Sequence, residues 1–351
     1  MMKPTAVDLF SGAGGLTQGL RQAGFNVVGA LEIDKDAADV FSLNHPKTKL
    51  INKDISEVSV DEAIEYWGIE KQKLDLLAGC PPCQGFSTIG TRNRKAAADD
   101  PRNELIFQML RFIEGILPRT IMLENVPALA KDARLQKFCN RLNELNYDYD
   151  VKVLDVQRYN VPQRRKRMIL LASRERDVAV HDVDLTEGNP KTVRMTFNKL
   201  KSSFLSNDSL SLLRTQHSER VMDIIRAIPH NGGSRCDLPD NLVLKCHKSI
   251  NGFKDVYGRM SWDLPSPTIT CGCNNPSKGR FIHPEEDRAI SLREAASLQT
   301  FPLSYKFPVS KGSQKISRMI GNALPPKFIE FHARCIRGIL SARPSVENNE
   351  H

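Results

Sequence analysis

The chain of 351 residues lacks any hydrophobic run close to the roughly 20 residues that a membrane-spanning helix needs. Its first residues pass from Lys3 and Pro4 into a short apolar stretch and then glycines, without the apolar core and cleavage site of a secretory signal. We therefore expect a cytoplasmic protein that does not insert into membranes. Internal repeats and extended low-complexity tracts are absent as well, so a repeat architecture is not expected.

Cysteine is scarce for a chain of this length. Eight cysteines in 351 residues do not form a disulfide framework, and a cytoplasmic location would keep them reduced. A structural zinc site needs four ligands. Besides the pair Cys80 and Cys83, the close pair is Cys271 and Cys273, which has one intervening residue and no histidine at zinc-finger spacing. We therefore expect free thiols and no metal site.

Negative charge is in deficit. The chain has 50 Lys and Arg against 41 Asp and Glu, a formal net charge of +9. Such an excess favours an acidic partner, most often nucleic acid, although by itself it supports only nonspecific attraction. The charge narrows the choice of partner and leaves the reaction open.

Short apolar runs alternate with amphipathic stretches over the first 175 residues. The apolar runs are rich in β-formers and end at Gly, Pro or acidic residues, which predicts strands at Thr5–Leu9, Asn26–Leu31, Leu74–Ala78, Thr120–Leu123 and Met168–Ala172. Helical spacing predicts helices at Leu16–Ala23, Lys35–Asn44, Val60–Trp67, Arg102–Leu117 and Arg134–Leu145. This alternation predicts an α/β fold with a doubly wound, mostly parallel sheet, whose ligands bind beyond the carboxyl ends of the strands.

The alternation disappears between about residues 175 and 280, where Ser, Asn, Asp, Lys and Pro become frequent. This composition predicts a second, smaller and loop-rich domain. Helical patterning returns at Ser291–Gln299 and at Gln314–Leu340. The predicted division is a catalytic and cofactor-binding domain (1–175), the loop-rich domain (176–285), C-terminal helices that pack back on the first domain (286–342) and a flexible tail (343–351).

A glycine-rich turn, "DLFSGAGGL", follows the first predicted strand. Gly12 and Gly14 satisfy the first half of the dinucleotide motif G-x-G-x-x-G, but Thr17 occupies the place of the third glycine. Glu32 lies 20 residues after Gly12, where an acidic side chain can accept hydrogen bonds from ribose hydroxyls. The pattern favours a nucleoside and does not demand a pyrophosphate. The simpler alternative is a tight strand-to-helix turn that only needs glycine.

The stretch "GCPPCQGFS" follows the predicted strand that ends near residue 78. From the motif alone a C-x-x-C redox pair, half a zinc site and a kinked loop all stay open. Cys80 ends a buried strand, where we expect it to pack as a small hydrophobic residue. Pro81 and Pro82 fix φ and remove two donors, so they would present Cys83 rigidly at the crevice.

Glu124 stands in "ENVP", directly after a buried strand. A carboxylate that leaves such a strand at its carboxyl end points into the crevice, and burial there would raise its pKa so that it can hold a proton. Alternatively, it caps a helix or pairs with an arginine.

The run "QRRKR" places four basic residues just before another apolar strand. Strand alternation would send Arg165 and Arg167 to one face and Arg164 and Lys166 to the other. One face could then meet a phosphate or a base oxygen, although a charge run is more often simply solvated.

Six segments together resemble the ordered motif set of the DNA cytosine-5 methyltransferases, in particular those of bacterial restriction-modification systems. They are "DLFSGAGGL", "GCPPCQGFS", "ENV", "QRRKR", "LREAASLQTFP" and "GNALPP". The resemblance runs from Ala6 to about Phe331 and is interrupted by the loop-rich region. It implies S-adenosylmethionine as the methyl donor, with a pocket lined by Phe10, Gly12 and Gly14, the ribose on Glu32, the adenine on Asp54 and Ile55, and Asn322 closing the site.

The resemblance also implies the chemistry. Cys83 would add to carbon 6 of cytosine, so that carbon 5 can attack the donor methyl. Glu124 would protonate or hydrogen-bond N3, while Arg165 and Arg167 would contact the base oxygen and its flanking phosphate. The substrate would be double-stranded DNA with the target base flipped out, and residues 84–100 would form a loop that closes over it.

Residues 176–285 match the place of the family's target-recognition domain. Arg259, Lys254, Lys248 and Arg280 are candidates there for contacts with guanine edges or phosphates. Trp262 is expected to pack. The family habit implies a monomer, and a restriction endonuclease acting on the same site is a partner that the sequence leaves open.

Three other functions compete with this one. The nearest is an RNA (tRNA) cytosine-5 methyltransferase with the same motifs, but its Cys-Phe-Thr element is replaced here by "CGCNN". A noncatalytic DNA-binding protein with a decayed domain would not keep every expected catalytic residue. A nicotinamide or dithiol oxidoreductase would leave the Glu124 and Gln163 motifs and the missing third glycine unexplained.

Overall fold

The computed structural model describes residues 3–82, 104–183, 190–203, 208–244 and 255–341. Cys83 and the predicted closing loop 84–100 therefore lie outside the described residues, as do Lys248, Lys254 and the predicted tail. Within these ranges, no helix is both long enough and apolar enough to cross a membrane.

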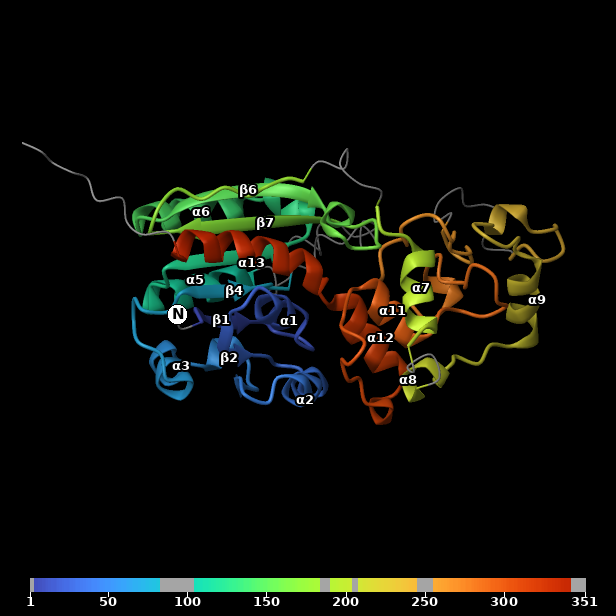
Figure 1. Ribbon diagram of the computed structural model, residues 1–351, viewed down its shortest axis with the longest axis horizontal. Helices are drawn as coiled ribbons and strands as arrows, with labels where there is room; N and C mark the ends of the chain where they lie inside the picture. Colours follow the sequence, from blue (N-terminus) through green and yellow to red (C-terminus); the bar gives the residue numbers. More distant parts are fainter. Residues whose placement is uncertain (1–2, 83–103, 184–189, 204–207, 245–254, 342–351) are drawn as a thin grey trace, which may run out of the picture.

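A mixed seven-stranded sheet with helices on both faces confirms the predicted α/β fold (Figure 1). The strand order is β3-β2-β1-β4-β5-β7-β6. The strands are β1 (Thr5–Leu9), β2 (Asn26–Leu31), β3 (Lys49–Ile51), β4 (Leu76–Gly79), β5 (Thr120–Asn125), β6 (Asp148–Asp155) and β7 (Lys166–Ser173). Strands β1 to β5 pair in parallel.

Two strands, β3 and β6, were not predicted. β3 has only three residues, and β6 is an edge strand whose exposed and half-buried charged residues obscure its apolar ones. The connection between β6 and β7, residues 156–165, contains one turn of 3-10 helix (Val156–Tyr159) and no crossover helix. Because a parallel neighbour needs a longer crossover, the chain reverses direction there.

The orientation of β7 differs from the simple parallel alternation that the sequence suggested. β7 runs antiparallel to both of its neighbours, β5 and β6. Asn125, at the carboxyl end of β5, pairs with Met168 near the start of β7. The residues that precede β7 therefore lie at the same edge as the residues that end β5, which a parallel β7 would have placed at opposite edges.

The five predicted helices around the sheet are confirmed, with ends shifted by a few residues. They are α1 (Gly15–Gln22), α2 (Lys35–Asn44), α3 (Val60–Trp67), α5 (Leu105–Ile116) and α6 (Ala133–Glu144). Side-chain caps explain several starts, because Asp34, Ser59 and Asp132 each accept a hydrogen bond from the first turn of their helix. Two apolar clusters, one on each face of the sheet, form the core between these layers.

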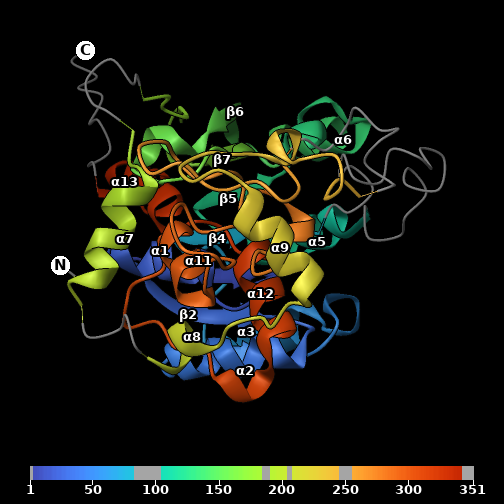
Figure 2. The ribbon, with the colours of Figure 1, turned by 90° about the vertical axis from the view of Figure 1, so that its right-hand side faces the viewer.

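A second group of helices and loops lies beside the sheet (Figure 1). It contains α7 (Val193–Lys201), α8 (Ser209–Leu212), α9 (Glu219–Ala227), α11 (Leu292–Leu298) and α12 (Ser313–Asn322). Figure 2 shows these helices in front of the sheet when the molecule is viewed from the side of α9. α7, α8, α11 and α12 share one apolar cluster, to which Ala13 and Val40 from the sheet side also belong.

The predicted helical stretch 314–340 is two helices, because Pro325 and Pro326 interrupt it after α12. The second, α13 (Pro326–Ser341), packs along α1 on the sheet. The predicted boundaries at 175/176 and 285/286 stay predictions.

Candidate active site

A cavity of about 500 Å³ lies beyond the carboxyl ends of β1, β2, β4 and β5. Its volume is in the range of roughly 300–1,000 Å³ that is typical of ligand pockets. The opposite wall comes from residues 268–271 and 318–324 of the second group. Nine predicted site residues line it: Phe10, Gly12, Glu32, Asp54, Ile55, Glu124, Arg165, Arg167 and Asn322.

The glycine-rich turn forms one end of this cavity. Phe10 and Gly12 both have positive φ, 62° and 55°. Gly14, the N-cap of α1, is not among the described lining residues, and a Cβ built there would lie 2.5 Å from the Tyr305 hydroxyl. Gly14 therefore permits close packing and does not itself face the cavity.

Glu32 is held by the backbone of two loops. Gly12 N donates to its Oε2 at 2.7 Å, and Asp34 N donates to its Oε1 at 2.7 Å. Burial raises the pKa of Glu32, and these two donors oppose that shift by stabilising the charged form. Because each carboxylate oxygen has a second lone pair, Glu32 can still accept hydrogen bonds from hydroxyl groups in the cavity.

Asp54 and Ile55 lie where β3 is followed by a 3-10 helix, Ile55–Glu57. The Asp54 carboxylate accepts hydrogen bonds from Ser56 N and Ser56 Oγ, which hold its pKa below the usual value. The cap fixes its orientation, while the Ile55 side chain is 3% exposed and provides an apolar wall. This end of the cavity is suited to a flat apolar group with polar edges.

α12 brings Asn322 to the cavity from the far end of the chain. Its Oδ1 accepts a hydrogen bond from Cys271 Sγ at 2.9 Å. Arg318, one turn earlier on α12, donates to Asp34 Oδ2 at 2.8 Å. Side chains from the second group thus close the cavity against the loop that follows β2.

Glu124 lies at the centre of the other half of the cavity and is 1% exposed. Its Oε1 is 2.9 Å from Arg167 Nε, an ion pair whose angles are not those of a hydrogen bond, so within the described residues this oxygen has no hydrogen-bond donor. Burial raises the pKa of Glu124, while Arg167, Cys80 and Arg165 oppose the shift. The carboxyl group is thus buried and charge-compensated, and one of its oxygens lacks a hydrogen-bond donor among the described residues.

Arg165 enters the same half and is 6% exposed. Its Nη1 donates to the backbone oxygens of Ile269 and Gly321 at 3.2 and 3.4 Å, whereas its Nε has no partner in the described part of the chain. Burial, with the nearby Arg167 charge, lowers its pKa to about 9, so it stays charged at neutral pH. Arg164 and Lys166 are exposed, as strand alternation predicted.

Sequence reasoning missed the part played by Gln163 and Gln299. Gln163 Nε2 donates to Gln299 Oε1 at 2.9 Å, and Gln163 Oε1 accepts from Ile269 N at 3.0 Å. Gln299 Nε2 in turn donates to Ile320 O at 2.6 Å. Both side chains are fully buried, and with a longer contact of 3.2 Å from Gln299 Nε2 to Ala323 O they link three of the motif segments, "QRRKR", "LREAASLQTFP" and "GNALPP". Both glutamines stand in segments that the sequence analysis had singled out, but their structural role depends on contacts between residues far apart in sequence.

Asp8, in "DLFSG", was also missed. It is fully buried in β1, accepts a hydrogen bond from Thr17 Oγ1 at 2.6 Å, and leaves Oδ1 without a partner among the described residues. Burial raises its pKa to about 7. Thr17 stands where a dinucleotide motif has its third glycine, and its hydroxyl here holds Asp8.

The expectation that Arg259 contacts DNA needs correction. Arg259 cannot reach DNA, because it is 0% exposed and all its donors are committed, to the backbone oxygens of Ile225, Ile228, His283 and Glu286 and to Asp287. Arg259 instead holds this part of the chain together by donating to four backbone oxygens. Trp262 packs edge-on against Phe197 and His283, as expected.

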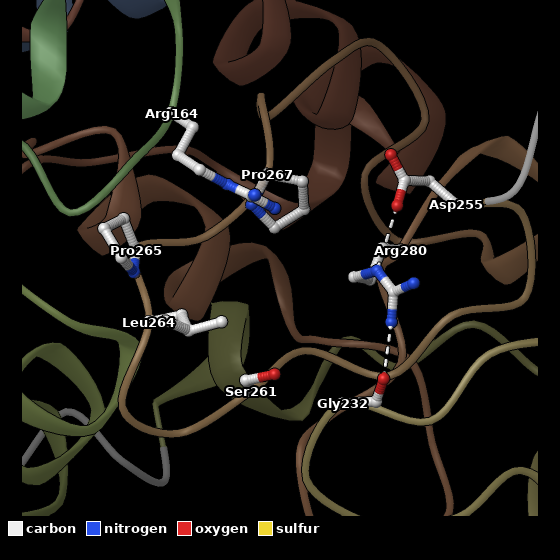
Figure 3. A pocket seen from close by; sticks show the side chains of 8 residues that line it. All are labelled: Arg164, Gly232, Asp255, Ser261, Leu264, Pro265, Pro267 and Arg280. Carbon is white, nitrogen blue, oxygen red and sulfur yellow. Dashed lines mark hydrogen bonds and ion pairs between the residues drawn. The ribbon is translucent and has the colours of Figure 1, made fainter.

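A second hollow of about 280 Å³ lies in the same region, and Figure 3 shows the side chains around it. Arg280 on one side is paired with Asp255 and donates to the Gly232 backbone oxygen. Arg164 on the other side extends toward Pro267, and its guanidinium makes no hydrogen bond or ion pair with the described residues. Arg164 is therefore a free positive charge, next in sequence to Arg165.

Comparison with known proteins agrees with this geometry. A family model for C-5 cytosine-specific DNA methylases matches residues 5–337. The chain is 37% identical over 354 residues to the Type II methylase M.HgiDII of Herpetosiphon aurantiacus, a match that covers 97% of this chain and 96% of that protein.

Solved structures show the same fold. A prophage-encoded Escherichia coli protein described as a DNA modification methyltransferase matches with a TM-score of 0.73 and 23% identity over 97% of this chain and 100% of its own. The Dnmt2 methyltransferase of S. pombe matches with a TM-score of 0.65 and 18% identity over 97% and 100%.

The fold and the site define an α/β methyltransferase. The chain belongs to the C-5 cytosine-specific DNA methylase family and is a DNA cytosine-5 methyltransferase, as its motifs implied.

Proposed function

We propose that this enzyme transfers a methyl group from S-adenosylmethionine to carbon 5 of a cytosine flipped out of a specific duplex DNA sequence, with Cys83 as the nucleophile. The observation that carries the proposal is that one cavity joins an acidic, backbone-anchored half around Glu32 and Asp54 to a half in which Glu124 faces Arg165 and Arg167. A donor and a base can therefore meet inside one enclosure.

The first half suits a positively charged nucleoside. Glu32 would bind the ribose hydroxyls, Asp54 and Ile55 the adenine edge and face, and Phe10, Gly12 and Asn322 the remaining surface. Two carboxylates on this side disfavour a pyrophosphate and favour a cation. S-adenosylmethionine would supply an electrophilic methyl group bonded to a positively charged sulfur, and the electrons of that bond would stay on the sulfur when the methyl group is transferred.

The second half suits a cytosine. Carbon 5 of cytosine is a weak nucleophile, so the Cys83 thiolate would form a bond to carbon 6, and N3 would gain a proton or hydrogen bond from Glu124. The electron pair released at carbon 5 then takes the methyl group. Loss of the carbon 5 proton to a base expels the Cys83 thiolate and restores the aromatic ring. Pro82, the chain neighbour of Cys83, lines the cavity, which supports this role.

The two arginines would complete the base site. Arg165, which is buried and charged with an unpartnered Nε, would hold the base oxygen, and Arg167 would hold the flanking phosphate while it fixes the Glu124 carboxylate. Carbon 6 is stacked inside a duplex, so the base must leave the helix at a cost of a few kcal/mol. Residues 84–100 would fill or cover the gap.

The biological setting follows from the relative. M.HgiDII is named a Type II methylase, so we propose that this enzyme methylates a defined site in a restriction-modification system, as a monomer and with a cognate endonuclease that cuts the same site. Residues 176–285 would recognise the sequence. The alternative substrate is RNA, tRNA in particular, for which the same catalytic residues would serve.

The test uses purified protein, labelled S-adenosylmethionine, mixed-sequence duplex DNA and tRNA. We expect methyl transfer to DNA and a covalent complex with duplexes that contain 5-fluorocytosine. Cys83→Ala should abolish both, whereas Cys236→Ala, at an exposed cysteine of the recognition region, should keep them. Transfer of the label to tRNA and not to DNA would show that the substrate is RNA. Full activity of Cys83→Ala would show that Cys83 is not the nucleophile.

A further inference from the structure

Cys80 contacts the candidate catalytic carboxylate directly. It follows the last residue of β4, Gly79, and its backbone N donates to Leu9 O at 3.3 Å. Its Sγ donates to Glu124 Oε2 at 2.9 Å, and it lines the same cavity. Cys80 packs against an apolar cluster of the sheet, as expected, but it also makes a polar contact that the sequence did not predict.

The two oxygens of Glu124 are held differently. Oε2 receives the thiol hydrogen bond from Cys80, whereas Oε1 lies 2.9 Å from Arg167 Nε without a hydrogen bond. A second contact fixes the neighbouring backbone, because Asn125 Nδ2 donates to Pro81 O at 2.9 Å. The carboxyl ends of β4 and β5 are thus joined by two adjacent side-chain hydrogen bonds, one of which ends on the reactive group.

Cys80 is suited to be a permanent donor. Burial raises the pKa of its thiol well above the usual value, and the neighbouring Glu124 charge raises it further. The thiol therefore keeps its proton at neutral pH and does not compete as a nucleophile. A thiol is a weak donor, so it can orient a carboxylate without holding it as tightly as an arginine fork would.

We propose that Cys80 is a positioning residue for the methyl-transfer reaction: its thiol holds Glu124 Oε2 and so fixes the orientation of the carboxyl group in the cavity wall. This inference rests on the proposed function of Glu124. It also divides the C-x-x-C pair by role, with one cysteine reacting with the base and the other orienting the carboxyl group.

The contact has a consequence for proton transfer. A hydrogen bond to the carboxylate stabilises its charged form and so lowers the pKa of Glu124, against the raising effect of burial. Removing the donor should raise that pKa. If transfer requires the protonated carboxyl group, the alkaline limb of the kcat–pH profile will then move to higher pH.

The experiment compares Cys80→Ala and Cys80→Ser in the full chain, with duplex DNA and labelled methyl donor, after both variants have been checked for melting temperature and cofactor affinity. We expect Cys80→Ala to lower kcat about five- to tenfold, the effect of one net hydrogen bond, with little change in KM and with the alkaline limb moved upward. Cys80→Ser keeps a donor and should recover most of kcat and the original limb. If Cys80→Ala does not fold, Cys80→Val fills the site without a donor and replaces it.

Wild-type kcat and an unchanged limb in the variant without a donor would overturn the proposal. Equal losses in the alanine and serine variants with no shift of the limb would do the same, since a merely structural role gives that result. Failure of the proposed function is a separate outcome, because wild-type protein would then transfer no methyl group and Cys83→Ala would change nothing.

Discussion

Gln163 and Gln299 are 136 residues apart in sequence, and their side chains are joined by a 2.9 Å hydrogen bond in the buried layer behind the active-site cavity. This pair connects the segment before β7 to α11, and through Ile320 O to α12. The strand that carries Arg167 and the helix that carries Asn322 are thereby attached to one another through buried side chains.

Gln299→Ala should therefore destabilise the enzyme. It would leave the Gln163 amide and the Ile320 carbonyl without their partner, a cost of about 1–3 kcal/mol for a buried unsatisfied group. Urea unfolding of the variant beside Gln136→Ala, an exposed glutamine of α6, measures the difference. Equal stability of the two variants would contradict the assigned role.

Asp8 should make stability depend on pH. Its pKa is about 7 in the folded protein, above the ordinary value of 3.8, so the folded state keeps a proton that the unfolded chain loses first. The contribution of Asp8 to folding stability is fully present below about pH 4, falls as pH rises toward 7 and is constant above pH 7. The Asp8→Asn side chain cannot ionise, so between pH 5 and 8 the free energy of unfolding of this variant should rise relative to that of the wild type by a few kcal/mol.

The measurement is chemical unfolding of both proteins across that pH range, with Asp61→Asn on α3 as the exposed-carboxylate control. A wild-type-minus-variant difference that does not change with pH would show that Asp8 is not the titrating group.

Arg164 should contribute to DNA affinity without taking part in chemistry. Its guanidinium has no hydrogen-bond or ion-pair partner within the described part of the chain and lines the hollow beside Pro267 (Figure 3). Arg164→Ala should raise the dissociation constant for duplex DNA and reduce the slope of log affinity against log salt by about one, the loss of one phosphate contact. Binding titrations at several salt concentrations test this, with Lys137→Ala, an exposed α6 lysine, as the comparison. An unchanged slope would place Arg164 outside the DNA interface.

Arg259 should behave in the opposite way. Arg259→Ala removes a fully buried guanidinium and leaves four backbone oxygens without their donor, so it should cost about 3 kcal/mol or more of stability, whereas its ion pair with the 44% exposed Asp287 adds little. Thermal unfolding and DNA binding together distinguish the alternatives: a variant of native stability that binds DNA weakly would restore Arg259 as a base or phosphate contact.

The sequence predicted local structure and ligand-bearing residues better than long-range geometry. Glu32 and Glu124 stand at the carboxyl ends of strands that periodicity predicted, so the alternation was enough to bring them together. Asp54 follows β3, which was not predicted, and was assigned only through the family resemblance. The antiparallel direction of β7 was not predictable from its own composition, because it depends on the intervening strand β6 and a connection too short for a crossover.

Roles that depend on tertiary partners were the hardest to predict. Arg259 and Arg164 have the same side chain, yet one is enclosed by backbone oxygens and the other is exposed. Cys80 looked like a packing residue until its distance to Glu124 was known. In each case the sequence supplied the chemical group, and the fold determined what that group meets.

The cavity is lined by Phe10 near the start of the chain and by Asn322 near its end, and the helix that follows Asn322, α13, packs along α1. A growing chain therefore cannot complete this cavity until α12 has been synthesised. The cavity is thus assembled from the two ends of the chain, and its last wall is also among the last parts to be synthesised.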